Sequence, residues 1–141
     1  MVSQTIEHLQ NQHSGVAQRN GVASPLVLVV EDHAGMRENL VVLLKMEGIA
    51  TITATNGDEA LQSIDQHTPK LVLLDMQLPG DTSGLDVLKA IRCNDAYADM
   101  RVILHTSEPH APSLPEAQAA DLVVLKPASP DDLLTFIYRL F

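Results

Sequence analysis

The sequence predicts an α/β fold: a doubly wound, five-stranded parallel sheet in the order 2-1-3-4-5, with helices on both faces. From Pro25 onward, short apolar runs alternate with segments whose apolar residues recur at helical spacing. The apolar runs are nearly continuous, as expected for parallel strands that are covered on both sides. Glycine, proline and asparagine punctuate the chain between the segments. Right-handed crossovers then distribute the helices over the two faces of the sheet.

The first strand and helix follow directly from the pattern after Pro25. Residues 26–30 are apolar and rich in valine, which predicts a buried strand that stops at Glu31 and Asp32. Helical spacing over residues 35–47 predicts a helix, and Gly48 is a suitable C-terminal stop. The apolar positions of this helix are Met36, Leu40, Leu43 and Leu44.

The second unit is a strand over residues 50–55, a turn at Asn56–Gly57 and another helix. The inner face of that helix carries Ala60, Leu61 and Ile64. A third strand covers residues 70–75, where an uninterrupted apolar run closes on the carboxylate of Asp75.

The third helix and the fourth strand are predicted over residues 84–93 and 101–106. The interval that follows is irregular, because its prolines forbid a long helix and leave at most a short one beginning near Pro115. These prolines are Pro109, Pro112 and Pro115.

Residues 121–125 supply the fifth strand, and a strong start signal for the last helix follows. Ser129 is a suitable N-cap, Pro130 fits the first helical position, and two acids occupy the first turn. The buried stripe of this helix is formed by Leu133, Ile137 and Leu140.

Composition narrows the class of protein. The 141 residues suffice for one domain with an ordinary core, since 45% of them are hydrophobic. A formal charge of -9 without any Lys/Arg run argues against direct binding of nucleic acid. The chain lacks an apolar run of the roughly 18 residues that span a membrane, and its N-terminus lacks the pattern of a signal peptide. With Cys93 as the only cysteine, we expect a cytoplasmic protein with no membrane partner.

Residues 1–24 differ in composition from the domain over residues 25–141. They are rich in Gln, Asn, Ser and His, and Glu7 and Arg19 are their only charged side chains. The extension is predicted to be either a flexible tail or a short amphipathic helix. The helical alternative rests on the spacing of Val2, Ile6 and Leu9.

Chemically active side chains stand at the ends of four of the five predicted strands. Glu31 and Asp32 follow the first strand, Asp75 closes the third, Thr106 ends the fourth, and Lys126 follows the fifth. In this strand order the carboxyl ends meet at the switch point between strands one and three, so the groups should converge. Each residue type alone is more often a turn, cap or surface residue. Their joint occurrence at one edge favours a functional site.

Three converging carboxylates repel one another unless a cation is present, and a site of carboxylate, carbonyl and water oxygens suits Mg²⁺. Asp75 could then be a nucleophile, because carboxylates form aspartyl-phosphates. Phosphoryl transfer requires mainly positioning and positive charge around the equatorial oxygens. Mg²⁺, the Lys126 ammonium and the Thr106 hydroxyl could each bind one of these oxygens.

From about Leu26 to the C-terminus the sequence resembles the receiver domain of bacterial two-component response regulators. The segments that carry the resemblance are VLVVED, LVLLDMQLPG, VILHTS and VVLKP. The resemblance implies a flavodoxin-like (CheY-like) fold with a cis peptide between the lysine and the proline of VVLKP. It also implies a sensor histidine kinase or a histidine phosphotransfer protein as the source of a phosphoryl group.

The resemblance assigns a role to each strand-end residue. Asp75 would accept the phosphoryl group from a phosphohistidine. Thr106 would follow the phosphate inward, and Lys126 would pair with it. The Mg²⁺ ligands would be Asp32, Asp75, the Gln77 backbone carbonyl and, through water, Glu31.

Several positions depart from the usual receiver pattern. Gly84 comes one residue late after Asp75, and Leu78 replaces a frequent methionine. Gln77 stands two residues past the acceptor, where its side chain faces the attacking water. Val123 occupies the position of a Tyr or Phe that rotates inward as the threonine moves. Together with the prolines of the fourth crossover, these departures predict an altered signalling face around helix four and strand five.

His33 and His105 are adjacent to Asp32 and Thr106, which raises the alternative of a transition-metal site. Side chains alternate along a strand, so His105 should point away from the site if Thr106 faces it. A packed or helix-capping role is therefore predicted for these histidines.

The sequence thus predicts a signalling switch rather than an enzyme, a stand-alone receiver without an output domain, monomeric or dimerising on phosphorylation. Phosphorylation would shift its conformational population, and a downstream protein would read the change. One alternative is a pseudo-receiver that binds partners without phosphorylation. Another is a phosphatase of the haloacid dehalogenase type, which usually has a second Asp where this chain has Gln77.

Overall fold

The computed structural model describes residues 25–141, and the helix considered around Val2, Ile6 and Leu9 lies outside the described residues. The strands are β1 (Leu26–Val30), β2 (Ala50–Ala54), β3 (Leu71–Leu74), β4 (Arg101–Thr106) and β5 (Leu122–Leu125). The α-helices are α3 (Ala34–Met46), α4 (Gly57–His67), α5 (Gly84–Arg92) and α6 (Pro130–Arg139). Between residues 25 and 141, no helix is both long and apolar enough to cross a membrane.

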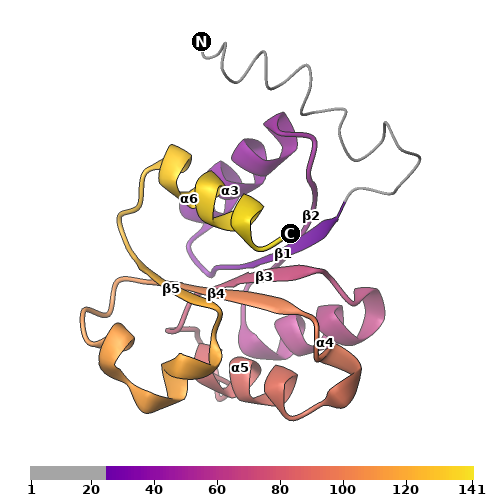
Figure 1. Cartoon of the computed structure of the whole chain (residues 1–141), viewed down its shortest axis with the longest axis vertical. Helices are drawn as coiled ribbons and strands as arrows, with labels where there is room; N and C mark the ends of the chain where they lie inside the picture. Colours follow the sequence, from indigo (N-terminus) through magenta and orange to yellow (C-terminus); the bar gives the residue numbers. More distant parts are fainter. Residues whose placement is uncertain (1–24) are drawn as a thin grey trace.

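All five strands are parallel and lie in the order β2-β1-β3-β4-β5. Figure 1 shows α3 and α6 on one side of the sheet and α4 and α5 on the other. The predicted fold class and strand order are therefore confirmed. The predicted element boundaries agree to within one or two residues, because apolar runs and capping residues mark both ends of most elements.

Alternate residues of the central strands face two separate cores, as the pleat of a strand requires. The core under α4 and α5 contains Leu28, Val30, Val72, Leu74, Val102 and Leu104. The core under α3 and α6 contains Val27, Val29, Leu71, Leu73, Ile103 and Val124. Any strand-end residue can therefore be assigned to one face by counting in twos.

The predicted turn at Asn56–Gly57 is wrong, because these two residues form the start of α4. Asn56 is the N-cap of α4, and its side chain accepts a hydrogen bond from the Glu59 amide at 2.8 Å. Gly57 opens the helix, where a Cβ would lie 2.4 Å from the Thr82 carbonyl oxygen. Asparagine suits both a turn and an N-cap, and the close approach of Thr82 explains why glycine follows it.

The crossover between β4 and β5 contains no α-helix, only the 3₁₀ segments η2 (Ala111–Ser113) and η3 (Pro115–Ala119). The prediction of at most a short helix beginning near Pro115 is confirmed. Each 3₁₀ segment has a proline in its first turn, where the missing amide proton costs no hydrogen bond. No long helix supports the segment between β4 and β5, so side chains from other elements must hold it in place.

The Arg92 side chain at the end of α5 supplies that support. Its guanidinium donates hydrogen bonds to the carbonyl of Ala119 at 2.8 Å, the carbonyl of Met100 at 2.8 Å and a carboxylate oxygen of Asp121 at 2.9 Å. The same Asp121 oxygen accepts a hydrogen bond from the Val102 amide at 2.8 Å. One side chain therefore connects α5, the start of β4, η3 and the start of β5.

Candidate functional site

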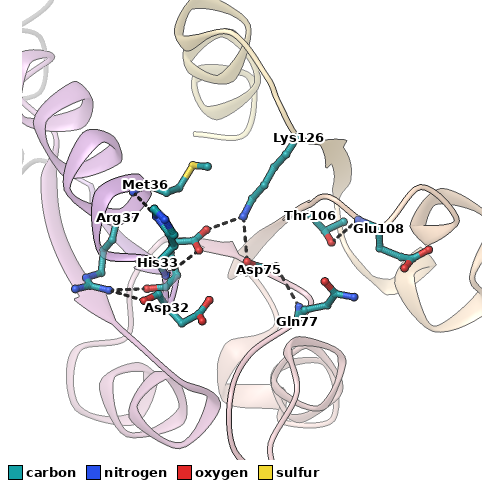
Figure 2. Close-up of polar contacts among 10 residues, drawn as sticks. Asp32, His33, Met36, Arg37, Asp75, Gln77, Thr106, Glu108 and Lys126 are labelled. Atoms are coloured by element: carbon teal, nitrogen blue, oxygen red, sulfur yellow. Dashed lines mark hydrogen bonds and ion pairs between the residues drawn. The ribbon is translucent and has the colours of Figure 1, made fainter.

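Three strands deliver charged side chains to one edge of the sheet. The Lys126 ammonium lies 2.8 Å from Glu31 Oε1 and 3.0 Å from Asp75 Oδ2. Figure 2 shows the Lys126 side chain directed toward Asp75. The side chains of Lys126, Glu31 and Asp75 are only 14%, 4% and 10% exposed. The convergence predicted from the strand order is therefore present as a buried ion-pair network.

The acidic cluster includes one more carboxylate. Single carboxylate oxygens of Glu31, Asp32 and Asp75 all lie within 4.8 Å of one another. Asp32 is exposed to solvent, whereas the other two are buried. Over residues 25–141 this is the one group of three or more acidic, histidine or cysteine side chains arranged to hold a metal ion, and it contains no histidine.

Burial alone would lower the pKa of the Lys126 ammonium. Hydrogen bonds to Glu31 and Asp75, together with their negative charges, outweigh this effect and raise that pKa above its ordinary value. The ammonium is therefore charged throughout the physiological pH range. It is the positive charge that offsets the two buried carboxylates.

Backbone contacts fix the position of Asp75. Its carboxylate Oδ1 accepts a hydrogen bond from the Gln77 amide at 3.0 Å, and the Gly84 amide donates to the Met76 carbonyl at 3.0 Å. A Cβ at Gly84 would lie 2.1 Å from the Asp75 carbonyl oxygen. Only glycine at this position lets α5 begin so close to the acidic residue.

The loop that carries the extra residue before Gly84 is anchored at its far end. The Thr82 hydroxyl donates a hydrogen bond to Asp58 in the first turn of α4 at 2.8 Å. Ser83 and Asp86 form a capping box at the start of α5. The longer loop is thereby fastened to both neighbouring helices.

Thr106 is fully buried, and its hydroxyl accepts a hydrogen bond from the Glu108 amide at 3.1 Å. In Figure 2 the hydroxyl is directed toward Glu108. The Thr106 carbonyl accepts a hydrogen bond from the Lys126 amide at 2.8 Å, and the Lys126–Pro127 peptide is cis. Thr106 and Lys126 are thus joined through their backbones at the same edge of the sheet.

Two side chains beside the acidic pair complete the surroundings. His33 is the N-cap of α3, where its Nδ1 accepts a hydrogen bond from the Met36 amide at 3.2 Å, so the predicted capping role is confirmed. The Arg37 guanidinium donates to the carbonyls of Glu31 and Asp32 at 3.0 and 3.3 Å. The sequence argument missed Arg37, although a cation five residues after Asp32, in the first turn of the next helix, was a usable signal.

The predicted orientation of His105 is wrong in part. Leu73 pairs with Ile103 in the parallel ladder, so two residues later Asp75 and His105 occupy the same row and the same face. His105 points away from the face of Thr106, but it shares the face of Asp75. The predicted packed role is confirmed, since the residue is 4% exposed. Burial, and next the charge of Lys126, lower the pKa of its imidazole to about 4, while Asp75 opposes the shift.

This buried imidazole predicts a pH-dependent stability. The unfolded side chain binds a proton near pH 6.5 and the folded one does not, so stability is complete above about pH 6.5 and falls as the pH approaches 4. Between about pH 7 and pH 5 the loss should be roughly 2 kcal/mol. His105→Leu should remove this part of the pH dependence in urea unfolding. The exposed-site variant His67→Gln should retain it, and an unchanged pH dependence in His105→Leu would contradict the assignment.

Comparisons with known proteins identify the family. Residues 27–138 match the response regulator receiver domain. The chain is 32% identical over 108 residues to the DNA-binding response regulator MtrA of Mycobacterium tuberculosis, covering 77% of this chain and 46% of MtrA. It is 32% identical over 110 residues to the phosphate regulon transcriptional regulatory protein PhoB of Pseudomonas aeruginosa, covering 77% of this chain and 48% of PhoB. The chain therefore belongs to the receiver domain family, and it spans about half the length of these relatives.

Solved structures agree with this membership. The response regulator TrrA of Thermotoga maritima, crystallised in complex with Mg²⁺ and BeF, has a TM-score of 0.77 and 37% identity, covering 83% of this chain and 99% of TrrA. The chemotaxis response regulator CheY4 of Vibrio cholerae has a TM-score of 0.77 and 26% identity, covering 84% of this chain and all of CheY4 (100%). The predicted family and CheY-like fold are confirmed.

Family membership defines the general class of function. Receiver domains of two-component systems are signalling switches rather than enzymes. They bind Mg²⁺ at their acidic site and interact with histidine kinases or phosphotransfer proteins.

Proposed function

We propose that this chain is a phosphorylation-controlled receiver that accepts a phosphoryl group on Asp75 and switches its binding to a downstream protein. The observation that carries the proposal is the Lys126 ammonium held between Glu31 and Asp75, with Asp32 beside them. A nucleophilic carboxylate, a fixed ammonium and a cluster of acids are the parts that phosphoryl transfer to an aspartate requires.

The donor set fits Mg²⁺. Three carboxylates within 4.8 Å of one another provide hard oxygen ligands, and the exposure of Asp32 leaves room for the waters that Mg²⁺ retains. We infer that Asp32, Asp75 and the Gln77 carbonyl hold the ion and that Glu31 contributes through water. When bound, the ion would neutralise charge on the transferred phosphoryl group.

The residues of the chain have distinct tasks in this proposal. An Asp75 oxygen attacks the phosphorus of a phosphohistidine, the new P–O bond replaces the P–N bond, and the donor imidazole leaves. The backbone amide of Gln77 donates a hydrogen bond to the other Asp75 oxygen and holds it in place during attack. Lys126, released from Asp75 by the reaction, pairs with the phosphoryl group. The Thr106 hydroxyl exchanges its Glu108 partner for a phosphoryl oxygen, which moves the loop after β4.

The proposed partners follow from this chemistry. A sensor histidine kinase or a histidine phosphotransfer protein supplies the phosphoryl group, which places the chain in the cytoplasm with ATP-dependent kinases. A downstream protein distinguishes the two conformations of the domain over residues 25–141, and residues 1–24 are an extension of it. Because the chain spans about half of MtrA and PhoB, their DNA binding is not assigned to it.

Phosphorylation of Asp75 can be tested directly. The protein is incubated with Mg²⁺ and acetyl phosphate, and intact-mass spectrometry should show a phosphoryl adduct that is absent from Asp75→Asn. Asp81→Asn, which alters an exposed acid in the following loop, should retain the adduct. Absence of an adduct from folded, Mg²⁺-loaded wild-type protein would favour the pseudo-receiver alternative.

A further inference from the structure

His105 is a buried polar side chain to which the proposed function assigns no role. The residue is 4% exposed. Within residues 25–141, no hydrogen bond joins either of its ring nitrogens to another group. Buried polar groups are nearly always paired, so an unpaired imidazole at the edge of a functional site calls for a partner.

The strand order places His105 under the path of the Lys126 side chain. Strand β4 lies between β3 and β5, so Lys126 must cross the end of β4 to reach Asp75. His105 is the β4 residue in the row of Asp75, and it pairs in register with Val124, two residues before Lys126. The charges of Lys126 and Asp75 both act on its ring, as this placement requires.

The donors of Lys126 and the ring of His105 are complementary. An ammonium has three N–H donors, and two of them are used by Glu31 and Asp75. The third has no hydrogen-bond partner among the described residues. A neutral imidazole has one ring nitrogen that accepts a hydrogen bond.

We propose that His105 is a positioning residue for Lys126: when another cation shares the carboxylates, the ammonium donates its third proton to the His105 ring, and this bond keeps the ammonium beside Asp75. The purpose of this positioning rests on the proposed function, since Lys126 is held for an incoming phosphoryl group. The contact itself requires no phosphorylation. Mg²⁺ alone should therefore reveal it, because the ion competes with Lys126 for the same two carboxylates.

The test follows the Lys126 ammonium by nuclear magnetic resonance in ¹⁵N-labelled protein, with and without Mg²⁺. In wild-type protein the ammonium protons should stay protected from solvent exchange after Mg²⁺ is added. His105→Leu, which keeps an apolar side chain of similar size, should lower this protection about fivefold. His105→Gln, whose amide oxygen can accept the proton, should restore it to within about twofold.

Phosphorylation by acetyl phosphate should slow about fivefold in His105→Leu and recover in His105→Gln. Equal Mg²⁺-loaded ammonium protection in wild type and His105→Leu would overturn the proposal. If His105→Leu does not fold, the wild-type protein provides the test. The ¹⁵N resonance of the accepting His105 ring nitrogen should shift when Mg²⁺ is added, while the ring resonances of exposed His67 should not. An unchanged His105 signal would overturn the inference. Failure of the wild type to form an adduct would contradict the proposed function and leave the ammonium measurement intact.

Discussion

Replacing Lys126 with alanine is expected to destabilise the metal-free protein by about 3 kcal/mol, because two buried carboxylates lose their common counter-charge. Glu31 and Asp75 are 4% and 10% exposed, so water cannot fully replace the ammonium. Breaking such a network from one side costs more than the network contributes, since it leaves uncompensated charge in the interior. Urea unfolding near neutral pH measures the effect.

Mg²⁺ should recover more stability in Lys126→Ala than in the wild type. The ion and the ammonium neutralise the same carboxylates, so the variant offers the ion a site without a competing cation. Binding to the folded state alone raises the free energy of unfolding with ion concentration. Mg²⁺ should not restore the rate of phosphorylation in Lys126→Ala, because the variant lacks the ammonium that would pair with the phosphoryl oxygens. We expect a decrease on the order of 100-fold in the rate of adduct formation with acetyl phosphate.

Lys45→Ala is the matched control, since Lys45 is an exposed lysine in the last turn of α3. It should change the free energy of unfolding by less than about 0.5 kcal/mol and leave the adduct rate unchanged. If Lys126→Ala unfolds at the wild-type urea concentration, or if Mg²⁺ stabilises both proteins equally, Lys126 is not the counter-charge of this site.

Much of the site could be predicted because the fold makes its position depend on strand order alone. Continuous apolar runs identified the parallel strands, and the residues after those runs had to meet at one edge. Glu31, Asp75 and Lys126 therefore converge as predicted, in spite of being far apart in the sequence. Their roles in phosphorylation remain proposals.

The incorrect and missed predictions concern features that the pattern of apolar and polar residues does not determine. The face of His105 was judged relative to Thr106, its neighbour in the strand, whereas its face relative to Asp75 depends on the register between β3 and β4. Apolar runs specify strands but not this register. The bonds from Arg37 to two backbone carbonyls likewise depend on the path of the chain between β1 and α3.

Replacing Arg92 with alanine is expected to loosen the crossover between β4 and β5. The variant loses three hydrogen bonds, to the carbonyls of Ala119 and Met100 and to the Asp121 carboxylate. Asp121 keeps the Val102 amide and Arg101 at 3.3 Å as partners, so its charge is not left alone. We therefore expect a loss of about 2 kcal/mol rather than the larger loss at Lys126.

The location of the loss matters more than its size. Short 3₁₀ segments have weaker hydrogen-bond geometry than an α-helix, and they do not stabilise themselves. Arg92 holds the end of η3 at the Ala119 carbonyl, and β5 begins three residues later at Leu122. Amide hydrogen exchange should show faster exchange over residues 117–125 in Arg92→Ala, while β1 and β3 change only with global stability.

Faster exchange over residues 117–125 in Arg92→Ala would connect the fold to the proposed signalling face around the β4–β5 crossover and β5. Val123 is partly buried against the core under α4 and α5. It stands where the resemblance to receiver domains implies an aromatic residue. Without that aromatic side chain and without an α-helix between β4 and β5, we expect a change at Thr106 to reach the surface through the β4–β5 crossover. Phosphorylation should then alter exchange in the same residues that Arg92→Ala loosens. Arg139→Ala, an exposed arginine in the last turn of α6, should affect neither. A phosphorylation response confined to other elements, with residues 107–125 unchanged, would show that the signal leaves Asp75 by a different route.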